Sequence, residues 1–203
     1  MFRHDVITAL ARHKALGIVR SDTPETALDA GSKLIDAGLR VVEVALTTPG
    51  ALEVIGELSS TRSDTLIGAG TVLDAMSCRL AILAGAQFVV APSLDLETMR
   101  TARRYGAASL PGVGSPTEAL TAMEEGADAV KLFPASAFGP SYIREVRAAL
   151  PQVPFVPTGG IGVDDVRTWL DAGAIAVGLG SALTNADDPA TAVKRVLSAV
   201  GQA

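Results

Sequence analysis

The residue whose type and position most directly indicate chemistry is Lys131. It lies in the run AVKLFP of residues Ala129–Pro134, where one ammonium group interrupts apolar neighbours typical of a buried strand. A buried lysine is costly unless it is paired or neutral, and a neutral amine in a dry pocket is a nucleophile that can form a Schiff base with a ketone. A lysine at a strand end whose ammonium reaches solvent would give the same pattern, so this segment alone leaves both interpretations open.

Glu43 is a second charge inside an apolar run, Val41–Ala45. Two opposite charges on separate strands could form a buried ion pair that only fills the core, although such a pair adds little to stability. Catalysis gives a stronger reason to keep them. Burial would lower the pKa of Lys131 from its usual value of about 10.4 until the amine can attack, and a nearby carboxylate could carry protons through Schiff-base chemistry.

Two glycine-containing segments near the end of the chain indicate an anion site. Thr158-Gly159-Gly160 follows one predicted strand and Gly180-Ser181 follows the next. Glycines there leave backbone N–H groups unshielded at helix starts, where an anion is favoured. Two tight turns without a ligand would need the same glycines. We predict a phosphate site built from backbone groups, without a lysine or an arginine.

Arg20, at the end of the first predicted strand, could clamp a carboxylate with two hydrogen bonds or could be an ordinary exposed arginine. His4 and His13 lie in a predicted leading helix, and we interpret both as surface residues. No group of His, Asp and Glu has the spacing of metal ligands, so we expect no metal site and no metal-dependent mechanism. Cys78 is the only cysteine, which excludes an internal disulfide and favours a small buried residue.

Composition and charge bound these hypotheses. The 203 residues suit a single domain, 1–203, since most domains have about 50–250 residues. Hydrophobic residues make up 48% of the chain and aromatic residues 4%, with 20 glycines, which favours an α/β core of small aliphatic side chains. A net charge of −5 argues against a nucleic-acid partner, which would require a basic face. We expect no signal peptide and no membrane helix, which would need about 20 apolar residues, and therefore a cytoplasmic protein.

The elements that must position these residues recur every twenty-odd residues. Most units end in a glycine that can close a helix in the left-handed conformation; these glycines are Gly38, Gly85, Gly106, Gly126 and Gly173. Continuous apolar runs after the helices indicate parallel strands buried on both faces. The eight predicted strands are Leu16–Arg20, Arg40–Leu46, Thr65–Gly70, Gln87–Ala91, Ala107–Gly112, Ala129–Phe133, Val153–Pro157 and Ala174–Gly178.

Eight strand–helix units without a linker predict a (β/α)8 TIM barrel, with a short helix at about Arg3–His13 before the first strand. A doubly wound sheet is the alternative, but nothing in the sequence marks the reversal of strand order that it requires. In a barrel the active site lies at the C-terminal ends of the strands. That rule selects the residues Arg20, Glu43, Thr47, Thr48, Thr71, Pro92, Ser93, Lys131, Thr158 and Ser181, all polar except Pro92.

Seven motifs at these strands carry a resemblance to a known family. They are Val42-Glu43-Val44, Ile67-Gly68-Ala69-Gly70-Thr71-Val72, Val90-Ala91-Pro92-Ser93, Leu110-Pro111-Gly112-Val113, Val130-Lys131-Leu132-Phe133-Pro134, Val156-Pro157-Thr158-Gly159-Gly160 and Gly178-Leu179-Gly180-Ser181. Together they resemble the class I 2-keto-3-deoxy-6-phosphogluconate aldolases and their 6-phosphogalactonate relatives. The match runs in register from the first strand to the eighth and covers nearly the whole chain.

The resemblance implies a metal-independent Schiff-base aldolase without a cofactor, which cleaves 2-keto-3-deoxy-6-phosphogluconate reversibly to pyruvate and glyceraldehyde 3-phosphate. It places Lys131 at the Schiff-base lysine and Glu43 at the proton-transferring glutamate. The family also implies a homotrimer. Positions that match the pyruvate pocket are Thr71, Pro92 and Phe133, and positions that match the distal and phosphate side are Thr158, Gly159, Gly160, Gly180 and Ser181.

One departure concerns the substrate carboxylate. Many family members carry an arginine just after strand two, where this chain has Thr47, whereas others keep one at the position of Arg20. Arg20 is therefore the candidate carboxylate clamp, in a pocket that Thr47 leaves looser.

Two residue patterns bear on the preferred epimer of the substrate, and they indicate different epimers. The segment Phe133–Pro140 resembles the phosphogalactonate branch, and Thr158 resembles the phosphogluconate branch. We give Thr158 more weight because it lies nearer the differing hydroxyl, and a site that hydrogen-bonds a hydroxyl can discriminate strongly. The alternatives are a phosphogalactonate or dual-epimer aldolase, then a phosphosugar isomerase or epimerase, and a non-catalytic phosphate-binding protein. The Glu43 and Lys131 pair argues against the last two.

Overall fold

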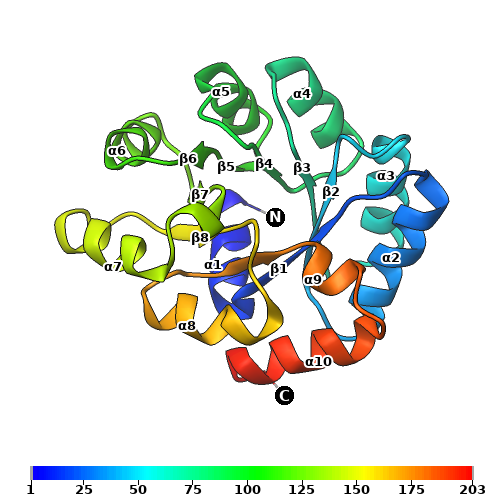
Figure 1. Ribbon diagram of the computed structural model, residues 1–203. Helices are drawn as coiled ribbons and strands as arrows, with labels where there is room; N and C mark the ends of the chain where they lie inside the picture. The colour runs from blue at the N-terminus through cyan, green and yellow to red at the C-terminus, as the bar shows by residue number, and fades with distance from the viewer. Residues whose placement is uncertain (1, 203) are drawn as a thin grey trace.

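The computed structural model describes residues 2–202, which form a leading helix followed by alternating strands and helices (Figure 1). The leading helix has the predicted bounds, and the strands overlap all eight predicted ranges. The strands are β1 Ala15–Val19, β2 Val41–Ala45, β3 Leu66–Gly70, β4 Phe88–Val90, β5 Ala108–Leu110, β6 Gly112–Val113, β7 Val130–Leu132, β8 Phe155–Pro157 and β9 Val177–Leu179. The helices are α1 Arg3–His13, α2 Pro24–Asp36, α3 Ala51–Thr61, α4 Ala75–Leu83, α5 Leu96–Arg104, α6 Pro116–Glu124, α7 Pro140–Ala149, α8 Val166–Asp171, α9 Ser181–Thr184 and α10 Pro189–Val200, with 3-10 turns η1 Ala135–Ala137 and η2 Val163–Asp165.

The strands are parallel and form two curled sheets within a ring of helices (Figure 1). One sheet has the order β5-β4-β3-β2-β1-β9 and the other the order β6-β7-β8. Neighbours follow the chain, and the last strand returns to the first, so the reversal required by a doubly wound sheet is absent from the described chain. The predicted barrel is found in part: this is a parallel α/β fold, but its ladder is not continuous through eight strands.

The predicted fifth strand is divided, and this explains one of the two breaks in the ladder. β5 pairs with β4, whereas β6 pairs with β7. Pro111 lies between them and has no N–H to donate, although its carbonyl oxygen accepts from the Lys131 N–H at 2.8 Å. On the other side, the two sheets meet through an isolated parallel bridge between Thr158 and Gly178.

Local sequence accounts for the helix ends. The five predicted helix-closing glycines all have positive φ, between 81° and 116°, which a side chain would strain. Several helices begin at a residue whose side chain accepts a hydrogen bond from a free backbone N–H of the first turn; these residues are Thr23, Asp74, Asp95, Ser115 and Asp188. These local signals therefore fix the two ends of the helices between successive strands.

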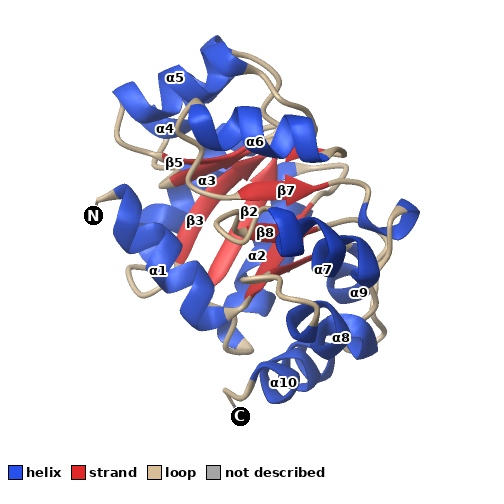
Figure 2. Ribbon diagram, turned by 90° about the vertical axis from the view of Figure 1, so that its left-hand side faces the viewer, coloured by secondary structure: helices blue, strands red, loops and turns tan. Residues whose placement is uncertain are grey.

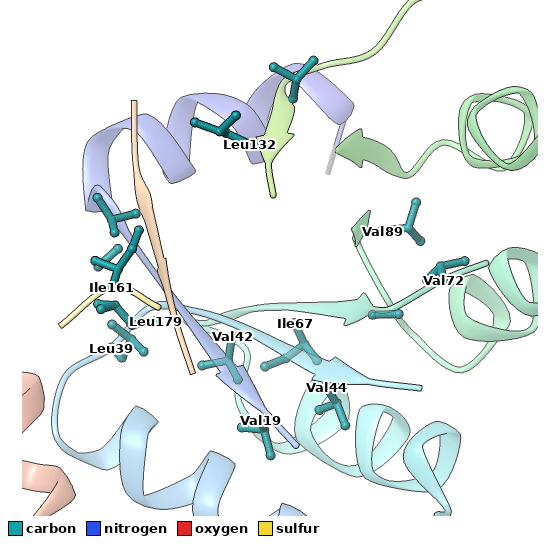
Figure 3. Packing of buried hydrophobic residues seen from close by; sticks show 14 of the residues in the cluster. Val19, Leu39, Val42, Val44, Ile67, Val72, Val89, Leu132, Ile161 and Leu179 are labelled. Carbon is teal, nitrogen blue, oxygen red and sulfur yellow. The ribbon is translucent and has the colours of Figure 1, made fainter. Parts of the chain in front are cut away.

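Side chains of the strands alternate between two apolar layers. The outer layer lies between the strands and the surrounding helices and includes Val42, Val44 and Ile67 (Figure 3). The inner layer includes Val41, Leu66 and Phe88 from the starts of the strands. Because successive residues of a strand face opposite sides, Glu43 follows Val41 on the inner face, and Lys131 follows Ala129 there.

Helix α1 closes the end of the fold at which the strands begin. Its residues Val6 and Leu10 are buried in the inner layer, where they pack with the first residues of the strands. Figures 1 and 2 show α1 lying across the end of the strands, inside the ring of the other helices. Helix α1 does not cover the opposite end, at the C-terminal ends of the strands, where a functional site can form. No helix within residues 2–202 has the length and apolar character needed to cross a membrane.

Candidate active site

A cavity of about 320 Å³ lies at the C-terminal ends of β1, β7, β8 and β9. Most of the residues predicted from the sequence line it together: Arg20, Glu43, Lys131, Phe133, Thr158, Gly159, Gly160, Gly180 and Ser181. Thr71 and Pro92 lie outside its lining. The fold thus brings the two charged strand residues and the two glycine segments to one place, although the chain separates them widely.

Lys131 is the central residue of β7, and its side chain faces the cavity while 95% of its surface is covered. In the ladder it pairs with Gly112 of β6 and Val156 of β8. Its ammonium nitrogen lies 4.7 Å from the centroid of the Phe133 ring. Burial lowers the pKa of Lys131; the charge of Glu43 opposes this shift and the charge of Arg20 adds to it. The amine is therefore easier to deprotonate than an ordinary lysine.

Glu43 is the central residue of β2 and is 1% exposed. Burial raises the pKa of its carboxyl group, while the positive charges of Lys131 and Arg20 act in the opposite direction. Its Oε2 atom has no hydrogen-bond partner within residues 2–202, and the described chain contains no direct ion pair between Glu43 and Lys131. A buried carboxyl oxygen without a partner is costly, and it belongs here to a residue that lines the cavity.

Arg20 supplies the third charge of the cavity, directly after β1. Its Nη2 atom donates a hydrogen bond to the Thr71 hydroxyl at 3.2 Å. Thr71 has a φ of 56°, a left-handed conformation that is rare for a β-branched residue and is tolerated chiefly at functional positions. Thr47 is exposed on the loop after β2, away from the cavity lining. Pro92 packs with its backbone against Gly112.

The glycine segment after β8 leaves one backbone donor free within the described chain. Gly159 and Gly160 have φ angles of 97° and 73°, so both are left-handed and suit only glycine. The carbonyl oxygens of Thr158 and Gly159 accept hydrogen bonds from the turn η1, at 2.8 Å and 3.1 Å. The parallel bridge between Thr158 and Gly178 engages the backbone of this segment, whereas the Gly160 N–H donates to no group within the described chain. Successive left-handed residues can form a concave backbone site that suits an anion.

The cavity is also lined by residues outside the predicted set: Ile18, Ile161, Gly178, Thr184 and Asn185. A period of two would have found Ile18 and Gly178, since each stands two residues before a predicted site residue on the same strand face. Thr184 and Asn185 follow Ser181 by one helical turn, so they share its face. Within residues 2–202, no three His, Cys, Asp or Glu side chains are grouped to hold a metal ion.

Known proteins share this sequence and fold. The family model described as KDPG and KHG aldolase matches residues 6–196. The chain is 40% identical over 173 residues to 2-dehydro-3-deoxy-6-phosphogalactonate aldolase of Escherichia coli (strain K12), with 84% of each chain covered. It is 34% identical over 166 residues to 2-dehydro-3-deoxy-phosphogluconate aldolase of Treponema pallidum (strain Nichols), with 81% of this chain and 79% of the relative covered. A solved structure described as native KDPGal matches with a TM-score of 0.86 and 36% identity, over 91% of this chain and 93% of that one.

Proposed function

The chain belongs to the family of KDPG and KHG aldolases, and on this premise we propose that it cleaves 2-keto-3-deoxy-6-phosphogluconate to pyruvate and glyceraldehyde 3-phosphate through a Schiff base. (The prefixes 2-keto and 2-dehydro denote the same group.) One observation carries the proposal: a buried lysine with a lowered pKa shares a cavity with a buried glutamate with a raised pKa. Schiff-base chemistry requires a neutral amine and a group that can both give and take a proton.

The first half of the reaction uses both perturbed groups. The neutral Lys131 amine attacks C2 of the keto acid to form a carbinolamine. The protonated form of Glu43, which burial favours, then gives its proton to the departing hydroxyl, and water leaves as the protonated imine forms. Glu43 is now a carboxylate beside a cation, a state in which it can accept a proton.

The second half breaks the carbon–carbon bond. The Glu43 carboxylate, through a water molecule, takes the proton of the C4 hydroxyl. The C3–C4 bond cleaves, its electron pair moves to the imine nitrogen, and glyceraldehyde 3-phosphate leaves. Protonated Glu43 gives this proton to C3 of the enamine, which regenerates the protonated imine. Water then hydrolyses the imine, and Glu43 takes back the proton that this step releases as pyruvate and the free Lys131 amine form. Atoms and charges balance at each step, and Glu43 ends as it began.

The two ends of the substrate meet different chemistry. We assign the substrate carboxylate to Arg20, whose guanidinium can bind it with two hydrogen bonds, with Thr71, Pro92 and Phe133 bordering the pyruvate end. We assign the phosphate to the segments of Gly159, Gly160, Gly180 and Ser181, and the distal hydroxyl to Thr158. The free N–H of Gly160 supports the phosphate assignment, because backbone donors can bind an anion without a cationic side chain.

Reductive trapping tests the central step. Borohydride added with pyruvate should attach one pyruvate-derived group to Lys131, identified by peptide mass spectrometry. Lys131→Met should abolish the adduct, and Lys33→Met, which removes an exposed lysine paired with Asp29, should not change it. Absence of an adduct on Lys131 would contradict the proposed Schiff-base mechanism. High activity of Lys131→Arg would instead support a phosphosugar isomerase or epimerase.

A phosphogalactonate or dual-epimer aldolase is the second candidate. The 40% identity to an enzyme with that name, against 34% to one named for the gluconate epimer, favours it. Thr158, buried and lining the cavity, favours the gluconate epimer. Comparing kcat/KM for the two epimers separates the candidates. Thr158→Val should reduce the preference for gluconate, and equal values for both epimers would identify a dual-epimer enzyme.

We also propose that the two sheets act as one (β/α)8 barrel and that residues 1–203 form one domain. The return of β9 to β1 and the bridge between Thr158 and Gly178 support this proposal. A crystal structure with continuous pairing from β5 to β7 and from β8 to β9 would establish it. The cytoplasmic location and a reaction without metal or cofactor remain predictions.

The homotrimer implied by the family has a candidate contact surface, the α4 patch of Leu73, Met76, Leu80 and Leu83. These side chains are between 47% and 76% exposed, and the last three stand on one face of α4. Such a patch is unusual on a monomer. Light scattering should give three times the 20.7 kDa chain mass. Leu80→Glu should lower that mass, and Leu120→Glu, a partly exposed leucine on α6, should not.

A further inference from the structure

Gly70, the last residue of β3, lies beside the carboxyl group of Glu43. β2 and β3 pair in parallel, with Glu43 opposite Gly68 and Ala45 opposite Gly70. A Cβ atom added to Gly70 would overlap Glu43 Oε1 and would stand 2.8 Å from Cδ and 3.3 Å from Cγ. The three heavy atoms nearest to that position all belong to Glu43. The glycine therefore leaves room for this carboxyl group.

The backbone does not explain why position 70 is a glycine. Positive φ angles occur at other glycines of the chain, but Gly70 is not among them, so an alanine would fit the local conformation. Glycine inside a strand contributes no packing and weakens it, and it often marks a close approach of another group. Here the approaching group is the Glu43 side chain.

Glu43 has few other contacts that could fix it. Its Oε2 atom has no hydrogen-bond partner in the described chain, and the side chain is buried. The charges of Lys131 and Arg20 attract the carboxylate from the cavity side, and the bare backbone of Gly70 limits it on the other. Packing, rather than a directional hydrogen bond, must set its position.

We propose that Gly70 is a positioning residue: its missing side chain admits the Glu43 carboxyl group to the place from which it exchanges protons with the adduct on Lys131. The proposal rests on the aldolase function proposed above. A methyl group at position 70 would push the carboxyl group away from that place, and a displacement of about 1 Å of a reacting group can cost about 10²-fold in rate.

Gly68 provides a matched control on the same strand and the same inner face. A Cβ atom on Gly68 would overlap the ring of Phe88, with Cδ2 at 2.6 Å, and none of the nearest atoms belongs to Glu43. Gly68→Ala and Gly70→Ala therefore add the same methyl group two residues apart. Only the second change should depend on the residue at position 43.

A double-mutant cycle tests this dependence. Gly70→Ala should lower kcat by about 10²-fold with KM changed less than about threefold, since proton transfer and not binding is disturbed. In the Glu43→Ala background, Gly70→Ala should lower the remaining kcat by less than about twofold, because residues that act as a unit are not additive. An equal loss in both backgrounds, or no loss with Glu43 present, would overturn the proposal.

Melting temperature gives a readout that does not require activity. Gly70→Ala should lower it when Glu43 or Glu43→Gln is present, since both side chains have the same shape, but not with Glu43→Ala, whose vacated space takes the methyl group. Gly68→Ala should lower it equally in all three backgrounds. If Gly70→Ala destabilises all three equally, or unfolds the protein even with Glu43→Ala, Gly70 serves the strand itself and the proposal is wrong. If the wild-type protein lacks aldolase activity, the proposed function fails, while this cycle still decides whether Gly70 positions Glu43.

Discussion

Two carboxyl groups removed from solvent lie at opposite ends of the strands, and they differ in how their oxygens are satisfied. Asp128 precedes β7, and its side chain is 12% exposed. Its Oδ2 atom accepts from the Ser109 N–H at 2.9 Å and from Arg3 at 3.4 Å. Glu43 keeps an oxygen without any partner in the described chain. Burial raises the pKa of both groups, so burial alone does not separate a structural charge from a functional one; the unsatisfied oxygen does.

The same contrast runs along individual strands. On the inner face of β2, Val41 is followed two residues later by Glu43. In the same way Ala129, just before β7, is followed two residues later by Lys131 within that strand. The first member of each pair packs with the layer that α1 covers, and the second lines the cavity. One strand thus contributes stability at its start and chemistry near its end, as parallel α/β folds favour.

Lys131→Met should give the largest effect on activity. Since enzymes accelerate their reactions by about 10⁶-fold or more, removal of the nucleophile should lower kcat by more than about 10⁴-fold. The free energy of unfolding should not fall, because an apolar side chain of similar size replaces a buried amine. Steady-state kinetics and guanidinium unfolding measure the two quantities. A large loss of stability would show that Lys131 belongs with the structural charges.

Glu43→Gln and Asp128→Asn compare the two carboxyl groups directly. Glu43→Gln should lower kcat by about 10²–10⁴-fold, the usual contribution of a positioned acid–base group. Asp128→Asn should leave kcat within about twofold and lower the free energy of unfolding by about 1 kcal/mol, since it weakens a charge-assisted hydrogen bond. Kinetics and denaturant unfolding of both variants provide the measurement. Similar losses of kcat in the two variants would contradict the division of stability and chemistry between the starts and the ends of the strands.

Some residues of the cavity can be predicted from the sequence because they stand out in their local segment, whereas others depend on packing between distant elements. Lys131 and Glu43 stand out because a charge interrupts an apolar run, and the glycines after β8 and β9 stand out by composition. Thr184 and Asn185 do not, because their place in the cavity depends on the short helix α9 and on how it packs. The division of the fifth strand has a local signal, since Pro111 cannot donate to the ladder. Which neighbour each half pairs with, β4 or β7, depends on the fold and is not encoded locally. The role of Gly70 is visible only from the neighbouring strand.

The pH dependence of stability should also separate the two perturbed cavity groups. The folded-state pKa of Glu43 is raised above its ordinary 4.5, so its stabilising contribution is fully present below pH 4.5 and is lost as pH rises through the raised pKa. The folded-state pKa of Lys131 is lowered from 10.5, so its contribution is present above pH 10.5 and is lost as pH falls through the lowered pKa.

Unfolding free energies across a pH series should therefore differ between variants. Relative to wild type, Glu43→Gln should lack the decline above pH 4.5, and Lys131→Met should lack the alkaline rise toward pH 10.5. Each full unit of pKa difference corresponds to about 1.4 kcal/mol. Asp128→Asn serves as the control, because it should leave the alkaline rise intact. Identical pH profiles for wild type and Lys131→Met would contradict the assignment of a buried, readily deprotonated amine.

Removal of the ion pair between Arg3 and Asp128 should give the smallest effect. This pair lies at the starts of the strands, the end of the fold that contributes stability and not chemistry. It joins α1 to the start of β7 at 3.4 Å, with the Arg3 side chain 31% exposed. Partly exposed ion pairs contribute about 0.2–1 kcal/mol, so Arg3→Gln should lower the free energy of unfolding by about that amount and leave kcat unchanged at temperatures where the protein is folded. In the Asp128→Asn background the same change should cost less, because the partner charge is gone. A tenfold loss of kcat in Arg3→Gln would mean that α1 influences the cavity across the whole length of the strands, and that stability and chemistry are not divided between the two ends.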